Sequence, residues 1–514
     1  MAKRVDFVDL TLRDGQQSIA ATRMTTQQAL EVLSMLNDAG FAAMELWGGA
    51  VLDSCVRFLN EDPWERLDRF AQVVGNPHKI RTLLRGQNLF AYQPFSDDLV
   101  IAFIKEAVRS GSGLIRIFDA LNDIRNMQIA MLAVKAYGGK AEAAISYTTS
   151  PVHTTEYFVK LALQLQNEGA DQIAIKDMAG LLRPAENAIL CRELKRKLRV
   201  PVTFHSHTTT GVAVLSAIVA MGAGIDVIDT AITPFAGGTS HPPIELMVTF
   251  AEALGIRHTI NKKLILKIQE RLFKIYEELR PHIPAYAPRR PIQYKDIDRA
   301  RVRTIARYVE KGDPDQYPEA LQQMHALMRD LGYPESKDQV FESQIPGGMY
   351  SNLQSQLQAM GKLDMLDKIL EEVPAVRADV GYVPLVTPTS QIVGSQATFN
   401  VMMGRYAIVS NEFKMLLRGE FGRLPAPPNP QVLAQALGPG EEPLRYRPAS
   451  YLSPVLEDRY NLPFVRTPRD LLLHLMLKQP ADEFLKRKYD VAGQPVAKPG
   501  NVAVAQSKRA FQTG

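Results

Sequence analysis

The sequence predicts an α/β protein: a (β/α)8 TIM barrel over residues 1–290, followed by a mostly α-helical C-terminal domain. Short runs rich in β-branched residues alternate with longer helical patterns through this first region. Such alternation indicates parallel strands joined by crossover helices, and eight units in under 300 residues suit a closed barrel. A proline-rich break at 280–293 ends the alternation, and the patterns beyond it are mostly helical.

The candidate strands are short apolar segments bounded by turn residues. They comprise residues 5–12, 42–47, 80–85, 114–119, 142–148, 171–177, 201–207 and 227–232. The stretch at 25–40 is a typical intervening helix, because Ala29, Leu33 and Leu36 recur near the helical period and Gly40 is a stop signal. An open doubly wound sheet is the alternative, but LTLRDGQQ, at the end of the first strand, lacks that fold's glycine-rich phosphate turn.

Beyond the barrel we expect a linker or extension at 291–343, a helical domain at 344–490 that completes the funnel over the barrel, and a flexible tail at 491–514. Helical patterns such as GKLDMLDKILEEVPAV support the second of these segments. The last segment is rich in Gly, Pro and small residues and holds no acidic residue, which is typical of a flexible terminus.

Composition limits the partners and the compartment. The net charge of +5 is small for 514 residues, so neither nucleic acid nor an anionic membrane surface is indicated as a partner. We find no apolar run long enough to enter a bilayer directly. Only Cys55 and Cys191 are present, which argues against disulfide stabilisation and favours a reducing cytoplasm.

A metal site is predicted where the first and seventh strands end. His205 and His207 are two residues apart on a strand, so both point to the same face. Asp14 follows the first strand, and in a TIM barrel the ends of the strands carry the active site. Two imidazoles and a carboxylate are suitable ligands for a divalent metal.

Lys176 ends the sixth strand, and its sequence context leaves two interpretations open. A charged ammonium beside a metal would be repelled, whereas a deprotonated lysine carbamylated by CO2 would offer an anionic oxygen ligand. The alternative is a lysine paired with Asp177.

Three further polar residues lie at strand ends, and one follows the last strand. Arg85 offers a fork of donors suited to a substrate carboxylate, although a structural ion pair at the rim is the commoner role. Arg13 is expected to pair with Asp14 or to orient it, and Gln17 lies near them. Thr239 stands in the glycine-containing stretch GGTSHP, where a hydroxyl could relay a proton or serve as an ordinary loop residue.

These residues belong to motifs that resemble the carboxyltransferase domain of the pyruvate carboxylase family, which also includes the central subunit of transcarboxylase and the alpha subunit of oxaloacetate decarboxylase. The match covers most of residues 4–485 in order. The motifs are LTLRDGQQS, ELWGGAVLD, EDPWERL, LLRGQN, FDALND, SYTTSPVHT, IKDMAG, HSHTTTG, PGGM and TPTSQIVG. The first and the HSH motifs also occur in isopropylmalate synthases and HMG-CoA lyases, whereas IKDMAG, LLRGQN, PGGM and TPTSQIVG resemble the carboxyltransferases only.

The resemblance implies a role for each candidate residue. Asp14, His205 and His207 would bind a divalent metal (zinc, manganese or cobalt), with carbamylated Lys176 as the fourth ligand. Arg85, Gln17 and Arg13 would be substrate-binding residues for pyruvate or oxaloacetate. Thr239 would contact substrate and carry the proton between the pyruvate methyl group and biotin. The family pattern often has Gln where this chain has His241, and the segment 296–343 is unusual for the family.

The sequence also indicates partners. No Ala/Val-Met-Lys-Met biotinylation stretch and no glycine-rich ATP-binding portion is found. We therefore expect biotin on a separate biotin carboxyl carrier protein, and a biotin carboxylase or second carboxyltransferase subunit on another chain; a homodimer is a family-based expectation. Split pyruvate carboxylase, transcarboxylase and oxaloacetate decarboxylase stay open. The competing functions are a metal-dependent acyl-CoA lyase or synthase and a non-catalytic scaffold.

Overall fold

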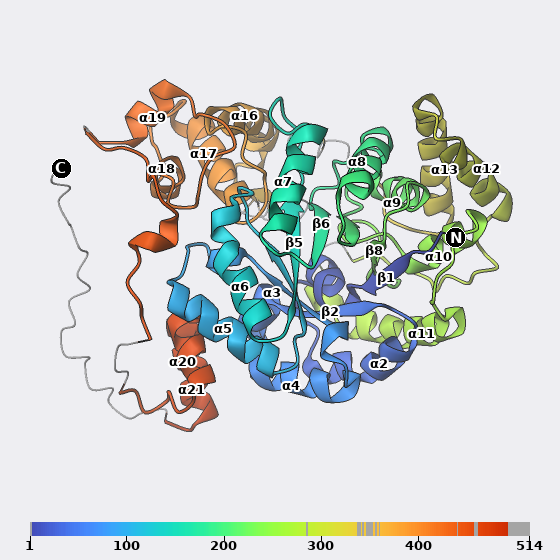
Figure 1. Cartoon of the computed structure of the whole chain (residues 1–514), viewed down its shortest axis with the longest axis horizontal. Helices are drawn as coiled ribbons and strands as arrows, with labels where there is room; N and C mark the ends of the chain where they lie inside the picture. Colours follow the sequence, from blue (N-terminus) through green and yellow to red (C-terminus); the bar gives the residue numbers. More distant parts are fainter. Residues whose placement is uncertain are drawn as a thin grey trace. The chain divides into compact units, whose positions relative to one another are not determined.

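Eight parallel strands close into a barrel in the computed structural model, with neighbours in chain order and β1 beside β8 (Figure 1). The strands are β1 (Asp6–Asp9), β2 (Ala43–Gly48), β3 (Ile80–Leu84), β4 (Leu114–Phe118), β5 (Lys140–Ser146), β6 (Gln172–Asp177), β7 (Val202–Ser206) and β8 (Val227–Thr230). This topology confirms the predicted barrel. The structure describes residues 3–283, 286–336, 341, 344–345, 353–354, 357–358, 360–438, 440–456 and 461–491.

Helices connect the strands and surround the barrel, because parallel neighbours need crossover connections. They are α1 (Gln16–Ala20), α2 (Thr26–Asp38), α3 (Gly49–Ser54), α4 (Pro63–Val74), α5 (Asp97–Arg109), α6 (Gln128–Ala136), α7 (Thr155–Asn167), α8 (Pro184–Lys197), α9 (Ala213–Gly222), α10 (Ile244–Ala253) and α11 (Lys262–Glu278). Helix α2 matches the pattern at 25–40: it begins after Thr25, which forms a capping box with Gln28, and it buries Leu33 and Leu36.

Strand β1 is shorter than the predicted run at 5–12, because the chain turns into the π-helical segment η1 (Thr11–Gly15). The Asp9 carboxylate fixes this turn by accepting hydrogen bonds from the Thr11 backbone N–H at 3.1 Å and from its hydroxyl at 2.6 Å. Single π-helical turns are frequent at functional sites. Here the turn brings Asp14 to within 3.8 Å of His205 at the end of β7.

The barrel interior holds charged side chains as well as apolar ones. Glu45, Arg81, Arg116, Glu142 and Asp229 come from five different strands, and each is at most 1% exposed. Arg81 pairs with Glu45 at 2.8 Å and with Asp229 at 2.9 Å. Arg116 pairs with Glu142 and with Asp229. Each buried charge therefore has an opposite partner, as burial in a low-dielectric interior requires.

The named elements that the structure describes beyond β8 are all helical, which confirms the predicted helical C-terminal region. After α11 they include α12 (Arg299–Lys311), α13 (Tyr317–Asp330), α16 (Leu366–Asp379), α17 (Thr389–Met403), α18 (Asn411–Leu417) and α19 (Pro430–Ala436). Val386, just before α17, packs with Phe118, Ala144 and Ala174, where β4, β5 and β6 run towards their carboxyl ends. This region thus covers part of the barrel end where the predicted site lies.

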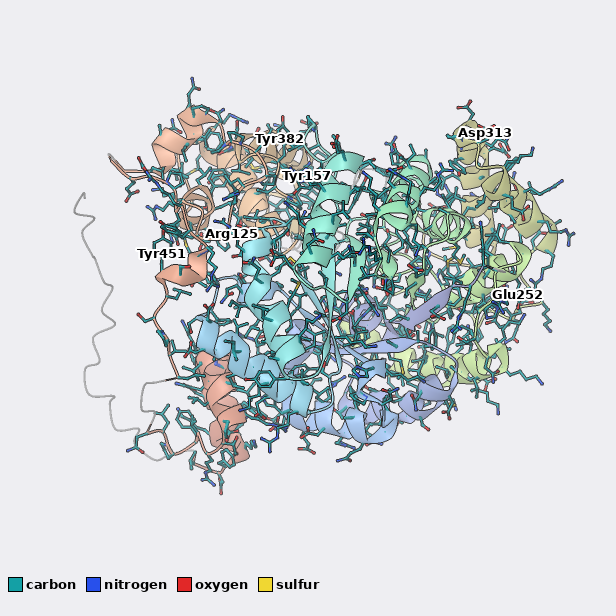
Figure 2. All side chains as sticks on the ribbon, in the orientation of Figure 1. Arg125, Tyr157, Glu252, Asp313, Tyr382 and Tyr451 are labelled. Carbon is teal, nitrogen blue, oxygen red and sulfur yellow. The ribbon has the colours of Figure 1, made fainter. Side chains whose placement is uncertain are left out.

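Polar contacts hold the same region to the loop after β4. Asn126 donates to the Phe421 carbonyl at 2.9 Å. Arg125, labelled in Figure 2, donates to the Arg445 carbonyl at 3.3 Å. Residues 1–456 form one compact unit by their internal contacts. The domain limits at 290, 343 and 490 stay predictions, and PGGM and the predicted tail beyond Val491 lie outside the described residues.

A second compact unit, 457–514, is described over 461–491 and contains α20 (Pro468–Leu477) and α21 (Gln479–Lys488). Thr467 and Asp470 form a capping box at the start of α20. Asp470 also accepts hydrogen bonds from Lys488 at 3.1 Å and Tyr489 at 2.8 Å, which joins the two helices. In the part of the chain that is described, no helix has both the length and the apolar character needed to span a membrane.

Candidate metal centre and adjoining pocket

Three imidazoles and one carboxylate converge at the carboxyl end of the barrel. Asp14 comes from η1, His205 from β7, His207 from just beyond β7, and His241 from the loop after β8. One possible ligand atom of each lies within 4.8 Å of the others. The Asp14 Oδ2 atom is 3.8, 3.7 and 3.3 Å from the Nε2 atoms of His205, His207 and His241. The predicted trio is thus brought together, and His241 joins it unpredicted.

The three rings are held by their other nitrogen. The Nδ1 atom of His205 contacts the Asp229 carboxylate at 2.8 Å, and that of His207 contacts the Thr239 carbonyl at 2.7 Å. The Nδ1 atom of His241 lies 3.1 Å from the Ser206 carbonyl. Oxygen acceptors at these positions assign the ring proton to Nδ1, which leaves the Nε2 lone pairs facing Asp14. Hydrogen bonds of this kind orient metal-binding histidines in known sites.

The electrostatics leave this group ready for a cation. Burial lowers the pKa of His207 to about 3 and that of His205 well below its usual value, so both rings are neutral at pH 7. Burial opposes ionisation of Asp14, but the Arg13 guanidinium, 2.8 Å away, holds the pKa of that carboxyl well below its usual range.

The unpaired atoms also fit a metal. Among the described residues, the buried Nε2 atoms of His207 and His241 have no hydrogen-bond partner. An unsatisfied buried acceptor is costly, and a divalent cation bound between the rings and Asp14 would satisfy both atoms. Neutral imidazoles with one carboxylate are a donor set suited to a divalent transition metal.

Lys176 lies beside this group, in register with His205 across β6 and β7. Its side chain is fully buried, and its Nζ atom is 3.0 Å from the His205 Nε2 atom. Burial lowers the pKa of Lys176 to about 8. The Asp177 carboxylate accepts from the backbone of Leu181 and Leu182 at 2.8 and 2.9 Å, so the hydrogen bonds recorded for it do not involve the lysine.

The buried charged residues of the barrel interior contact two members of the candidate metal centre. Arg13 pairs with Asp14 on one side and with Glu45 on the other. Asp229 contacts His205 as well as Arg116. Glu45, Arg116 and Asp229 were not predicted from the sequence, although charged residues in the middle of apolar strands were a signal that could have found them.

A small pocket opens at the same end of the barrel. It is lined by Arg85, Asn88, Asp119, Ala120, Thr387, Pro388 and Phe421. The Arg85 Nη1 atom donates to two backbone carbonyls, at 2.9 and 3.0 Å. Burial raises the pKa of Asp119 to about 7. The pocket therefore combines a cation with a carboxyl group that can hold a proton near neutrality.

The two other predicted site residues lie nearer the metal centre. Gln17 accepts from Arg13 at 3.1 Å through its side-chain oxygen. The Thr239 hydroxyl donates to the Ser18 carbonyl at 2.9 Å, while the Thr239 carbonyl accepts from His207. Thr239 does not appear among the residues that line the pocket, whereas Thr387 does.

Comparisons with known proteins match two family models, a conserved carboxylase domain over residues 340–513 and an HMGL-like family over residues 112–272. The chain is 39% identical over 499 residues to a pyruvate carboxylase subunit of Methanocaldococcus jannaschii, covering 96% of this chain and 79% of that protein. It is 38% identical to the methylmalonyl-CoA carboxyltransferase 5S subunit of Propionibacterium freudenreichii, covering 95% and 88%.

Two further similarities bear on substrate and fold. The chain is 37% identical to the 2-oxoglutarate carboxylase large subunit of Hydrogenobacter thermophilus, covering 86% of this chain and 61% of that one. Its fold is similar to the carboxyl transferase domain of Rhizobium etli pyruvate carboxylase solved with pyruvate. That match has a TM-score of 0.71, 28% identity, and coverage of 95% and 78%.

Proposed function

Because this chain belongs to the carboxyltransferase family of the Methanocaldococcus jannaschii pyruvate carboxylase subunit and the transcarboxylase 5S subunit, we propose that it transfers a carboxyl group between carboxybiotin and pyruvate. Run in reverse, the same site decarboxylates oxaloacetate. The observation that carries the proposal is the convergence of Asp14, His205 and His207 beside buried Lys176, at the barrel end where Arg85 lines a pocket.

In this proposal Asp14, His205 and His207 hold a divalent metal, zinc, manganese or cobalt. A bound metal supplies Lewis-acid polarisation of the keto oxygen. Lys176 is carbamylated by CO2 and presents an anionic oxygen to the cation. A lysine with a pKa of about 8 is neutral in roughly a tenth of the molecules at pH 7, and the neutral amine is the form that reacts with CO2.

Arg85 and Gln17 bind the keto acid. Only Nη1 of Arg85 is used in the backbone contacts that the structure records, so the rest of the fork is available for a substrate carboxylate. Arg13 keeps Asp14 ionised and positioned, and it donates to the Gln17 oxygen, which holds the Gln17 side chain beside the centre. Arg13 and Gln17 therefore act together at the substrate side of the centre.

The proton balance requires one carrier. Carboxybiotin loses CO2 and gains a proton on its ring nitrogen; pyruvate loses a methyl proton, and its methyl carbon then bonds to CO2. We assign the transfer to the Thr239 hydroxyl. Thr387 is a second candidate, because it lines the pocket with Arg85 whereas the Thr239 hydroxyl donates to Ser18.

We propose that the carboxyl group arrives on biotin carried by a separate biotin carboxyl carrier protein, in keeping with the similarity to separate carboxyltransferase subunits. A biotin carboxylase, or a second carboxyltransferase subunit, completes the system. The homodimer and the cytoplasmic location stay predictions. The HMGL-like match makes biotin-independent cleavage of an acyl-CoA the competing activity.

The test is oxaloacetate decarboxylation by the purified chain, with and without free biotin. We expect pyruvate formation that biotin stimulates and that Lys176→Ala abolishes. Of Thr239→Ala and Thr387→Ala, the variant that loses the biotin-dependent rate identifies the proton carrier. Thr398→Ala is the matched control, because that hydroxyl donates to the Gly394 carbonyl within α17.

Two results would redirect the proposal. A folded, metal-loaded protein that ignores biotin but cleaves an acyl-CoA would replace it with the lyase activity. If the protein decarboxylates the carboxylation product of 2-oxoglutarate faster than oxaloacetate, the proposed carboxyl transfer stands, but 2-oxoglutarate replaces pyruvate as the substrate.

A further inference from the structure

His241 is a buried imidazole to which the proposed reaction gives no role. We infer that His241 is a protein ligand of the metal, so that the centre is built from three imidazoles and one carboxylate. This inference rests on the proposed metal site but not on the carboxyl transfer reaction.

The position of the His241 ring is that of a ligand. Its side chain is fully buried, and its ring centroid lies 4.7 Å from that of His205 and 4.3 Å from that of His207. Its Nε2 atom is 3.3 Å from Asp14 Oδ2. In a tetrahedron with bonds of about 2.1 Å, ligand atoms are about 3.4 Å apart, so this contact has the length of one edge.

The loop holds the ring in that orientation. The His241 Nδ1 atom lies 3.1 Å from the carbonyl of Ser206, the residue between the other two histidines. Gly237 donates its backbone N–H to the His241 carbonyl at 2.9 Å, and Thr208 donates to the Ser240 carbonyl at 2.7 Å. The end of β7 therefore carries two ligands and positions the third.

The other nitrogen of His241 is aimed at the remaining members of the metal centre, 3.3 Å from the Asp14 carboxylate. The His241 Nε2 atom is buried and has no hydrogen-bond partner among the described residues, although it points at the carboxylate and the two neighbouring rings. A packing histidine normally has both nitrogens satisfied. A cation at the meeting point of the rings supplies the missing partner.

The third imidazole changes which metal the site prefers. Imidazole-rich sites favour zinc or cobalt, whereas sites dominated by oxygen ligands suit manganese and magnesium. Carbamylated Lys176 would add a fifth donor to the four side chains that would hold the metal. Zinc or cobalt, rather than manganese, is therefore the metal that His241 selects.

The test counts imidazoles directly. X-ray absorption of the zinc-loaded full chain is expected to show three imidazole ligands in the wild type and two in His241→Gln, whose amide keeps a donor for Ser206. Zinc affinity, measured by competition with a chromophoric chelator, is expected to fall by at least about tenfold in this variant. Manganese affinity should change less, so the zinc-to-manganese ratio falls.

His153→Gln is the matched control. His153 is another buried ring, held by Ser150 at 2.7 Å through one nitrogen, and its other nitrogen has no partner within the described residues. The variant should keep three imidazoles and wild-type zinc affinity. Two imidazoles in the wild type, or unchanged zinc affinity in His241→Gln, would overturn the inference. The wild-type count decides the matter even if the variant does not fold.

The same measurements distinguish a failure of this inference from a failure of the proposed carboxyl transfer. Three imidazoles in a protein without biotin-stimulated decarboxylation would overturn the proposed function and leave this inference standing. Two imidazoles in a fully active protein would do the reverse.

Discussion

Replacing Asp229 with Asn tests whether the barrel interior positions the metal centre. The Asp229 Oδ2 atom accepts from His205 at 2.8 Å and from Arg81 at 2.9 Å, and it also pairs with Arg116. The asparagine has nearly the same shape and keeps an acceptor at this position. The substitution therefore removes the negative charge while leaving the packing in place.

The expected loss of unfolding free energy depends on which ion pairs remain after the substitution. Removing one member of a buried ion pair costs about 3–5 kcal/mol of unfolding free energy. Arg81 keeps Glu45 at 2.8 Å, and Arg116 keeps Glu142, so we expect the lower end, about 3 kcal/mol. Loss of a carboxylate behind a metal-binding histidine lowers metal affinity by about 10–100-fold.

The pH dependence of this loss has a definite sign. Burial alone would raise the pKa of Asp229, but the Arg116 and Arg81 guanidinium groups hold it below its usual value. A carboxyl whose pKa is lowered by folding stabilises the protein above its unfolded pKa of about 3.9, and this contribution is lost as pH falls through the folded value. The difference between variant and wild type should thus be complete at pH 7 and shrink in acid.

The assay is urea unfolding of metal-free protein at pH 7, with zinc affinity measured in parallel. Asp6→Asn is the matched control, because Asp6 pairs with Arg4 at 2.9 Å on the surface, where the two side chains are 33% and 58% exposed. Such a pair contributes about 0–1 kcal/mol. If Asp229→Asn costs no more than the control and binds zinc as tightly as wild type, the interior network does not position the centre.

Three other results are expected. Arg85→Lys keeps the charge but loses the planar fork, so the KM for oxaloacetate in steady-state kinetics should rise on the order of tenfold; an unchanged KM would place the substrate elsewhere. Removing the metal with a chelator should lower stability by about 4 kcal/mol relative to protein with metal at a thousand times its Kd, read as a lower melting temperature. Thr25→Ala should cost about 1 kcal/mol by breaking the capping box of α2, without changing activity.

The barrel could be predicted because its signals are local. The alternation of strands and helices, and the helical spacing of Ala29, Leu33 and Leu36, are visible within short stretches of sequence. The early end of β1 could not, because the hydrogen bonds from Thr11 to Asp9 compete with a strand that its apolar sequence would otherwise favour. A helical domain over the barrel was expected, but the particular contact of Val386 with β4, β5 and β6 joins segments far apart in the chain, and periodicity gives no signal for it.

The site residues also differ in whether local sequence was enough to predict them. His205 and His207 follow from their spacing at the end of a strand, and Asp14 from its place after the first strand, although the turn that carries Asp14 to them was not predicted. His241 lies in an irregular loop, and only the folded position of the Ser206 carbonyl turns its ring towards the others. The sequence points to the hydroxyl of Thr239, yet in the structure its carbonyl is what contacts His207.

The buried charges of the barrel are better explained by orientation than by stability. A buried ion pair is often no more stabilising than apolar residues of the same volume, because both charges lose their hydration. An apolar interior, however, could not hold the His205 proton on Nδ1. Nor could it hold Arg13, through its pair with Glu45, beside the Asp14 carboxylate that Arg13 keeps ionised. Both ends of the network stop at a metal-ligand candidate. A barrel whose interior were repacked with apolar residues should therefore fold and yet lose its metal.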